Sequence, residues 1–274
     1  MKIIIIIFLL FLIINKQYGQ NLILNPSFEV FAKDKYGNLY AQDWLVPNTS
    51  TIDYYSIISN TKFYSIPNNF LGFHPAYEGS AYIGFVLFNW SGEMEHYTGT
   101  LKEPLKKDSD YQISFYIRYA GDSVWIYSKS IELLFTKESK ISLWDTRYQI
   151  VYTNGNLLTS NIKIDIEQAY ITKDWVKCNA KYKAKGGERF ITFGLFYQGD
   201  NFIKLINEYS KDYFKSFEKQ VKFINSHEEY PIFTNKHFKP TIQKRDFVFA
   251  YYFLDAVSVT PFKKGDPEED YTYP

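Results

Sequence analysis

The stretch that decides the fold is YQISFYIRY, residues 111–119, in which apolar and polar side chains alternate without a break. Successive side chains of a β-strand point to opposite faces, so a period of two indicates a strand with one buried face and one wet face. This stretch therefore predicts a strand of a half-buried sheet. The side chains on its apolar face are Tyr111, Ile113, Phe115, Ile117 and Tyr119.

Strand patterns recur along the chain, and short clusters of turn-forming residues separate them at 107–110, 154–156 and 185–188. Many short strands joined by turns, with few helical patterns, are typical of an all-β sandwich. The clearest further strands are AYIGFVLFN (81–89), SIELLFT (130–136), RFITFGLFY (189–197) and FVFAYYFLDAVSV (247–259).

Residues 1–19 have the pattern of a secretory signal peptide. A basic residue, Lys2, precedes an apolar run from Ile3 to Ile14, and the small residue Gly19 marks a cleavage position. The run is shorter than the ~20 residues that a membrane-spanning helix needs, and no second apolar span follows it. We therefore expect an exported protein that is periplasmic, held at the outer surface or secreted, without an integral membrane span.

The charge of the chain excludes a general affinity for nucleic acid. The formal net charge is +1, and removal of Lys2 and Lys16 with the signal peptide brings it to −1. A nearly neutral protein has no long-range attraction for polyanions such as nucleic acid or an anionic membrane.

The single cysteine, Cys178, excludes an intramolecular disulfide. It lies in VKCNAKYKA (176–184), where apolar side chains alternate with lysine and asparagine, and it belongs to the apolar set. We interpret it as a small buried side chain and not as a nucleophile.

Residues 201–246 interrupt the strand pattern and are predicted to be a helical or irregular insertion. Within 201–225 the apolar residues recur at steps of three, four and seven, which is typical of an amphipathic helix. Acids mixed with its lysines favour a helix packed on its own sandwich; a helix on a membrane surface is the alternative. Residues 261–274 are acidic and contain proline, so we expect a disordered tail.

Sequence signatures of catalysis are missing: the chain has no HExxH zinc motif, no phosphate-binding loop, no GxGxxG and no GxSxG. The sequence GDS at 121–123 matches the start of an esterase block, but the chain has no DxxH, so we interpret it as a polar turn. Two carboxylates for glycoside hydrolysis are defined by their distance in space, so this alternative stays open. The available acids are Glu78, Glu93, Glu95 and Glu103.

An acid in the last strong strand predicts a metal site. In YYFLDAVSV (251–259), Asp255 is in phase with Val257 and Val259, so it faces inward if the valines do. A buried carboxylate is costly unless it is paired or metal-bound, so we expect a Lys or Arg, backbone donors or a cation to meet Asp255. Glu29, in NPSFE (25–29), follows the first strand, which in sandwiches often runs beside the last. We hypothesise that Glu29 and Asp255 bind a structural Ca²⁺ together with backbone carbonyl groups.

Several motifs occur in a fixed order along the chain. They are NLILNPSFEV (21–30), AQDWLVPNTSTIDYYS (41–56), NNFLGFHPAYEGSAYIGF (68–85), LKEPLKKDSDYQISFYI (101–117), ITKDWVKCNAKYKAKGGERFITFGLF (171–196) and AYYFLDAVSV (250–259). This order resembles a module of Bacteroidetes secreted and outer-surface proteins. That module often precedes an OmpA-like or sorting domain, and it is similar to the galactose-binding-like jelly roll of carbohydrate-binding modules. The resemblance covers residues 21–260 apart from the 201–246 insertion.

The resemblance implies a jelly-roll β-sandwich over residues 20–260, no catalysis, and a metal held by Glu29 and Asp255 as in calcium-bearing carbohydrate modules. The chain departs from the pattern in three ways. It carries the insertion, it lacks a following OmpA-like or sorting domain, and it has one acid before Ala256 where related sandwiches often show two.

Binding of a glycan, which the resemblance suggests by fold, needs exposed aromatic rings on which sugars can stack. The alternatives are a structural or protein-adhesive domain of the cell envelope and a glycoside-hydrolase-like enzyme. Trp44 and Trp175 are expected in the core. The stacking candidates, which lie among polar or turn residues, are Trp90, Trp125, Tyr54 and Tyr55.

Overall fold

The structure is a computed structural model that describes residues 20–47, 53–89, 94–121, 127–139, 142–144, 150–153, 156–157, 159–196 and 249–262. For the segments between 142 and 157 it describes the backbone only. The predicted signal peptide (1–19), the insertion (201–246) and the tail beyond Phe262 lie outside the described residues.

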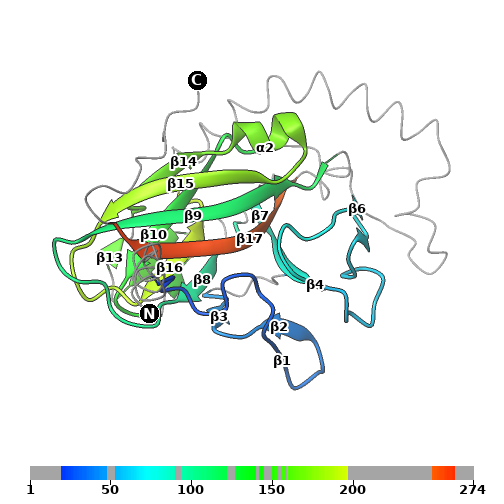
Figure 1. Cartoon of the computed structure of the whole chain (residues 1–274), viewed down its shortest axis with the longest axis horizontal. Helices are drawn as coiled ribbons and strands as arrows, with labels where there is room; N and C mark the ends of the chain where they lie inside the picture. The colour runs from blue at the N-terminus through cyan, green and yellow to red at the C-terminus, as the bar shows by residue number, and fades with distance from the viewer. Residues whose placement is uncertain are drawn as a thin grey trace, which may run out of the picture.

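Two five-stranded antiparallel sheets form the body of the protein, one in front of the other (Figure 1). The front sheet contains, in spatial order, β15 (Val176–Lys183), β9 (Asp110–Tyr119), β17 (Phe249–Pro261), β7 (Ala81–Asn89) and β4 (Asp53–Ser56). The back sheet contains β14 (Ile162–Asp165), β10 (Ser130–Thr136), β16 (Phe190–Gly194), β8 (Tyr97–Thr100) and β3 (Trp44–Leu45). Strands far apart in sequence are neighbours in both sheets, which confirms the all-β jelly-roll sandwich.

Smaller elements lie around the two sheets. Among the described residues, no helix is long and apolar enough to cross a membrane. The elements are the hairpin β1 (Phe31–Lys33) and β2 (Leu39–Ala41), the pair β5 (Asn68–Asn69) and β6 (Gly72–Phe73), the strands β11 (Ser142–Trp144), β12 (Ile150–Thr153) and β13 (Asn156–Leu157), and the helix α2 (Glu167–Thr172).

The core lies between the sheets and is largely aromatic. The ring of Phe115 on β9 meets that of Phe193 on β16 edge-on, with centroids 5.3 Å apart, and Trp44 lies 6.1 Å from Phe193. Trp44 is thus in the core, as predicted. Cys178 is buried too, and burial raises the pKa of its thiol to about 12, which confirms a packing role.

The segment 21–26 ties the two sheets together. The N–H of Leu22 donates to the carbonyl of Val259 on β17 (2.8 Å), and its carbonyl accepts from Lys102, just after β8 (2.7 Å). The side chain of Asn21 accepts from the N–H of Val259 (2.9 Å) and donates to the carbonyl of Val257 (2.9 Å). The beginning of the described chain therefore does run beside the last strand.

A bulge in β17 changes the phase of that strand. Asp255 pairs with Tyr116, whereas Ser258 pairs with Ser114 and Val259 with Ile113, and Ala256 has φ of +49°. Partners in a sheet share a face, so Asp255 lies on the outward face with Tyr116, opposite to Val259. The prediction that Asp255 shares a face with the valines is wrong, because the extra residue reverses the alternation.

Asp255 is nevertheless buried, because the connection 57–80 covers this half of the outward face. The ring of His74 lies 4.8 Å from Phe253 on β17, and Phe70 stacks over Tyr55 on β4 at 6.5 Å. The outward face of the front sheet is therefore divided. The half over β4, β7 and part of β17 is covered, and the half over β9 and β15 is more open.

Loss of one core ring should measurably destabilise the sandwich. We expect Phe193→Ala to lower the free energy of unfolding by about 3–5 kcal/mol, because it leaves a cavity between the sheets. Urea denaturation followed by tryptophan fluorescence measures the change. The matched control is Phe73→Ala at an exposed ring of β6, which we expect to change stability by about 0.5 kcal/mol or less; equal effects of the two variants would contradict this core.

Candidate functional site

The open half of the outward face carries a regular polar surface. The register of β15, β9 and β17 places Asn179, Ser114 and Ser258 in one row across the strands. The next row contains Lys181, Gln112 and Thr260. These six residues, which we call the polar face, carry hydroxyl, amide and ammonium groups and are half-buried or exposed as residues, although the amide oxygen of Asn179 is itself buried.

An aromatic cluster borders the polar face. Tyr116, next to Ser114 on the outward side of β9, carries the ring of Tyr77 stacked on it, with centroids 3.4 Å apart and planes at 16°. Trp175 meets Tyr77 edge-on at 6.4 Å. Tyr77 is 45% exposed although its ring rests on Tyr116. We call Tyr77, Tyr116 and Trp175 the aromatic platform.

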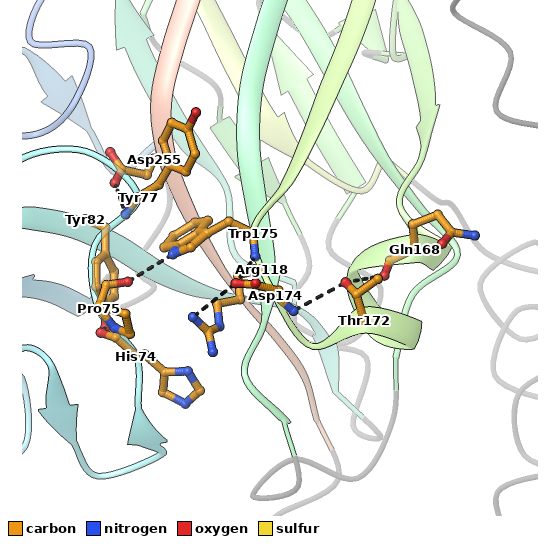
Figure 2. A network of polar contacts seen from close by, with 10 residues as sticks. All are labelled: His74, Pro75, Tyr77, Tyr82, Arg118, Gln168, Thr172, Asp174, Trp175 and Asp255. Carbon is orange, nitrogen blue, oxygen red and sulfur yellow. Dashed lines mark hydrogen bonds and ion pairs between the residues drawn. The ribbon is translucent and has the colours of Figure 1, made fainter.

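Trp175 is held in place by polar contacts on both sides (Figure 2). Its indole N–H donates to the carbonyl of Pro75 (2.9 Å), and its backbone N–H donates to the carboxylate of Asp174 (2.8 Å). Asp174 is also 3.6 Å from the guanidinium of Arg118. The prediction that Trp175 fills the core is wrong. It precedes β15, is only partly buried and packs against Tyr82 on the outward side.

A neutral histidine, His74, lies near Arg118. Burial, and secondarily the positive charge of Arg118, lowers the pKa of His74 to about 4. Its Nε2 lies 3.3 Å from the carbonyl of Leu71. His74 therefore packs as an uncharged ring in the covered half and is no general base for chemistry on the platform.

Three backbone N–H groups surround the carboxylate of Asp255. Tyr77 and Glu78 both donate to Oδ2 (3.0 Å each), and Ala256 donates to Oδ1 (2.7 Å). Burial raises the pKa of Asp255 to about 7, although the N–H donors act in the opposite direction. The carboxylate fixes the start of the turn 77–81 (Figure 2).

Glu29 holds the other end of the same turn. Its Oε1 accepts from the N–H groups of Ser80 (2.8 Å) and Ala81 (3.0 Å), and its Oε2 accepts from the hydroxyl of Ser80 (2.6 Å). Gly79, between the two ends, has φ of +66°, and a Cβ there would overlap Oε1 of Glu29. Glu29 and Asp255 therefore lie at the same turn, which agrees with the prediction that they are close together. The contacts that the structure shows are hydrogen bonds to the turn.

The donor set does not fit calcium. Ca²⁺ takes six to eight oxygen ligands, whereas the groups bonded to these two carboxylates are five N–H groups and one hydroxyl. These donors compete with a cation for the same lone pairs. In the part of the chain that the structure describes, no three acid, histidine or cysteine side chains gather as metal ligands. The calcium site stays a prediction.

The four predicted stacking residues have different outcomes. Trp90 and Trp125 lie outside the described residues. Tyr54 and Tyr55 are 5% and 0% exposed, so neither ring can receive a sugar. The hydroxyl of Tyr54 donates to the carbonyl of Phe28 (2.8 Å), and that of Tyr55 bonds the hydroxyl of Tyr251 (2.9 Å). The expectation failed for two reasons: Tyr54 shares the inward face of the sheet with Ile83, and Tyr55 faces outward beneath the connection 57–80.

Sequence reasoning missed the aromatic platform, although one signal was present. In 111–119 the polar set is Gln112, Ser114, Tyr116 and Arg118, so a tyrosine stands on the wet face of the strand. A large aromatic side chain in an otherwise polar set is the mark of a surface ring. Tyr77 gives no such signal, because its position depends on the turn.

Comparisons with known proteins find distant similarity to solved structures. No protein-family model matches the chain, and no curated protein matches it. A similar solved structure is the N-terminal CBM22-1–CBM22-2 tandem domain of Xyn10C from Paenibacillus barcinonensis: identity 14%, TM-score 0.37, with 92% of this chain and 48% of that chain covered.

Two further solved structures cover most of this chain. The K2 cleaved adhesin domain of Lys-gingipain is 10% identical, with a TM-score of 0.40, and 86% of this chain and 97% of that chain are covered. An arabinose-bound α-L-arabinofuranosidase is 10% identical, with a TM-score of 0.40, and 90% and 27% are covered. The chain thus spans less than two thirds of the tandem domain and of the arabinofuranosidase. Because the identities and TM-scores are this low, the function is argued from the site alone.

The neutral state of His74 can be tested by titration. We expect NMR to give a pKa of about 4 for His74 and a higher value in Arg118→Gln, where the positive charge is gone. Because the unfolded histidine titrates near 6.5, its contribution to stability is complete above that pH and is lost as the pH falls toward 4. Asp255, whose pKa burial raises to about 7, acts in the opposite direction over this range, so the test is a comparison: thermal denaturation should show the wild type losing stability relative to His74→Gln as the pH falls from 6.5 to 4.

Part of the loss should remain in His74→Gln, because burial lowers the pKa of His96 to about 4 as well. A His74 resonance that titrates near 6.5 and does not respond to Arg118→Gln would contradict this arrangement.

Proposed function

We propose that the protein is an exported, non-catalytic binding module whose ligand is a glycan laid across the aromatic platform and the polar face. The observation that carries the proposal is Tyr77, an exposed ring held flat by a second tyrosine. A sugar ring has an apolar C–H face and a rim of hydroxyl groups. The platform offers the flat apolar partner, and the polar face beside it offers partners for the rim.

Rigidity favours this use of Tyr77. Its ring rests on Tyr116, and its backbone N–H is bonded to Asp255 (3.0 Å). A ring that is already fixed loses little conformational freedom when a ligand stacks on it, so more of the contact energy becomes affinity.

The polar face can satisfy hydroxyl groups in both directions. Serine, threonine and the amide of Gln112 both donate and accept hydrogen bonds, as sugar hydroxyls do. Lys181 adds a donor at the rim, although it also lies 4.0 Å from Asp110 and over the ring of Phe262.

Carboxylates close to the platform make structural contacts, which supports a non-catalytic function. A glycosidase needs two carboxyl groups that face one sugar. Asp255 is buried under three N–H groups, Asp174 is paired with Arg118, and the exposed Glu78 accepts from the hydroxyl of Ser27.

A protein-adhesive function is the second candidate, and one observation favours it. The hairpin β1–β2 and the residues that follow it expose several large apolar side chains that could meet another protein. They are Val30, Phe31, Tyr36, Tyr40, Leu45 and Val46.

A glycan array with the secreted form of the chain tests the proposal. We expect binding to at least one glycan, and we expect Tyr77→Ala to weaken it by about tenfold or more, which corresponds to ~1.4 kcal/mol. Trp90→Ala and Trp125→Ala extend the test to the predicted rings outside the described residues. Isothermal titration with the best glycan gives the affinities.

The matched control is Tyr36→Ala, which removes an exposed tyrosine from the hairpin β1–β2, away from β9 and β15 in Figure 1. It should bind as the wild type does. Equal affinity of Tyr77→Ala and the wild type would refute the platform. Binding of no glycan, together with loss of protein adhesion in Phe31→Ala, would favour the adhesive alternative.

A further inference from the structure

One turn, residues 77–81, is held from two sides by carboxylates that come from opposite ends of the described chain. We infer that Glu29 and Asp255 form a metal-independent clasp on the backbone N–H groups of this turn, and that the clasp positions Tyr77 on Tyr116. The consequence for ligand binding rests on the proposed function. The clasp itself does not.

The contacts divide the turn between the two acids. Asp255 accepts from the first two N–H groups, of Tyr77 and Glu78, and Glu29 accepts from the last two, of Ser80 and Ala81. Gly79 lies between them in the left-handed region. Successive N–H groups that point to one side form a concave site for an anion, and here each half of the turn faces one carboxylate.

Asp255 and Tyr116 are opposite each other on neighbouring strands. Tyr77 is bound to both of them, through its N–H to the carboxylate (3.0 Å) and through its ring to the tyrosine (3.4 Å between centroids). Two attachments to one cross-strand pair fix both the backbone and the ring of Tyr77. Asp255 is therefore a positioning residue for the platform.

Glu29 secures the end of the turn where β7 begins at Ala81. It follows Phe28, which has φ of +61°, is fully buried, and packs against Trp44 with centroids 4.8 Å apart. The carboxylate thus projects from an anchored backbone. Ser27 adds a third link, because its hydroxyl donates to the carboxylate of Glu78 (3.0 Å).

Hydrogen bonds to ionised carboxylates are shorter and stronger than neutral ones, so these donors can satisfy the buried Asp255 and the exposed Glu29 without a cation. This differs from what the resemblance to calcium-bearing modules implies. In this chain, backbone N–H groups bond the carboxylate oxygens of Glu29 and Asp255 and compete there with a cation for the oxygen lone pairs.

The test compares Glu29→Gln, Asp255→Asn and the exposed control Glu103→Gln in excess calcium and in EDTA. We expect the wild type to melt at the same temperature in both solutions. We expect the two clasp variants to melt lower in both, and Glu103→Gln to behave as the wild type. Amide exchange at Ser80 and Ala81 should accelerate by about tenfold in Glu29→Gln.

A spectroscopic readout separates positioning from general stability. The wild type should show nuclear Overhauser contacts between the rings of Tyr77 and Tyr116. These should weaken in Asp255→Asn and Glu29→Gln, while contacts in the core between Phe115 and Phe193 persist. If Asp255→Asn does not fold, Glu29→Gln alone decides the question.

Three results would overturn the clasp. The first is a wild type that melts at a higher temperature in calcium than in EDTA, with no such difference in Asp255→Asn. The second is unchanged amide exchange at Ser80 and Ala81 in Glu29→Gln. The third is unchanged contacts between the rings of Tyr77 and Tyr116 in both variants. A wild type that binds no glycan would refute the proposed function and leave these three readouts intact.

Discussion

A buried carboxylate on the outward face of a sheet is the constraint on which this side of the molecule depends. Asp255 faces outward because of the bulge at Ala256, and an anion in that position requires donors. The turn 77–81 supplies them, so it must cross the sheet at this point. The same crossing buries the outward rings of β4 and β17 and leaves β9 and β15 more open.

The inward half of the fold could be predicted from the sequence, and the outward half largely could not. Alternation in 111–119 places its strand correctly, because a period of two is a local property. The predicted orientation of Asp255 was wrong because one inserted residue at Ala256 reverses the side chains that follow it. The burial of Tyr55 depends on the connection 57–80, whose course is set by tertiary contacts.

The candidate site could also be predicted only in part. In the sequence, Tyr116 stands out as an aromatic residue in a polar set, although it was not selected as a site residue. Glu29 and Asp255 were correctly predicted to lie close together. Backbone donors were one of the expected partners of Asp255, but the turn 77–81 that supplies them was not predicted, because backbone N–H groups carry no side-chain signal and any residue type supplies them. The competing donors became evident once the turn was placed between the two acids.

The alternation of β9 also has a meaning for protein engineering. Its inward side chains, such as Phe115, meet the back sheet, whereas Gln112 and Ser114 on its outward side lie beside side chains of β15 and β17 on the same face. Residues that pack the core therefore alternate along one strand with residues of the proposed binding surface. A library restricted to Gln112, Ser114, Asn179 and Lys181 would vary the surface chemistry while the packing between the sheets stays as it is.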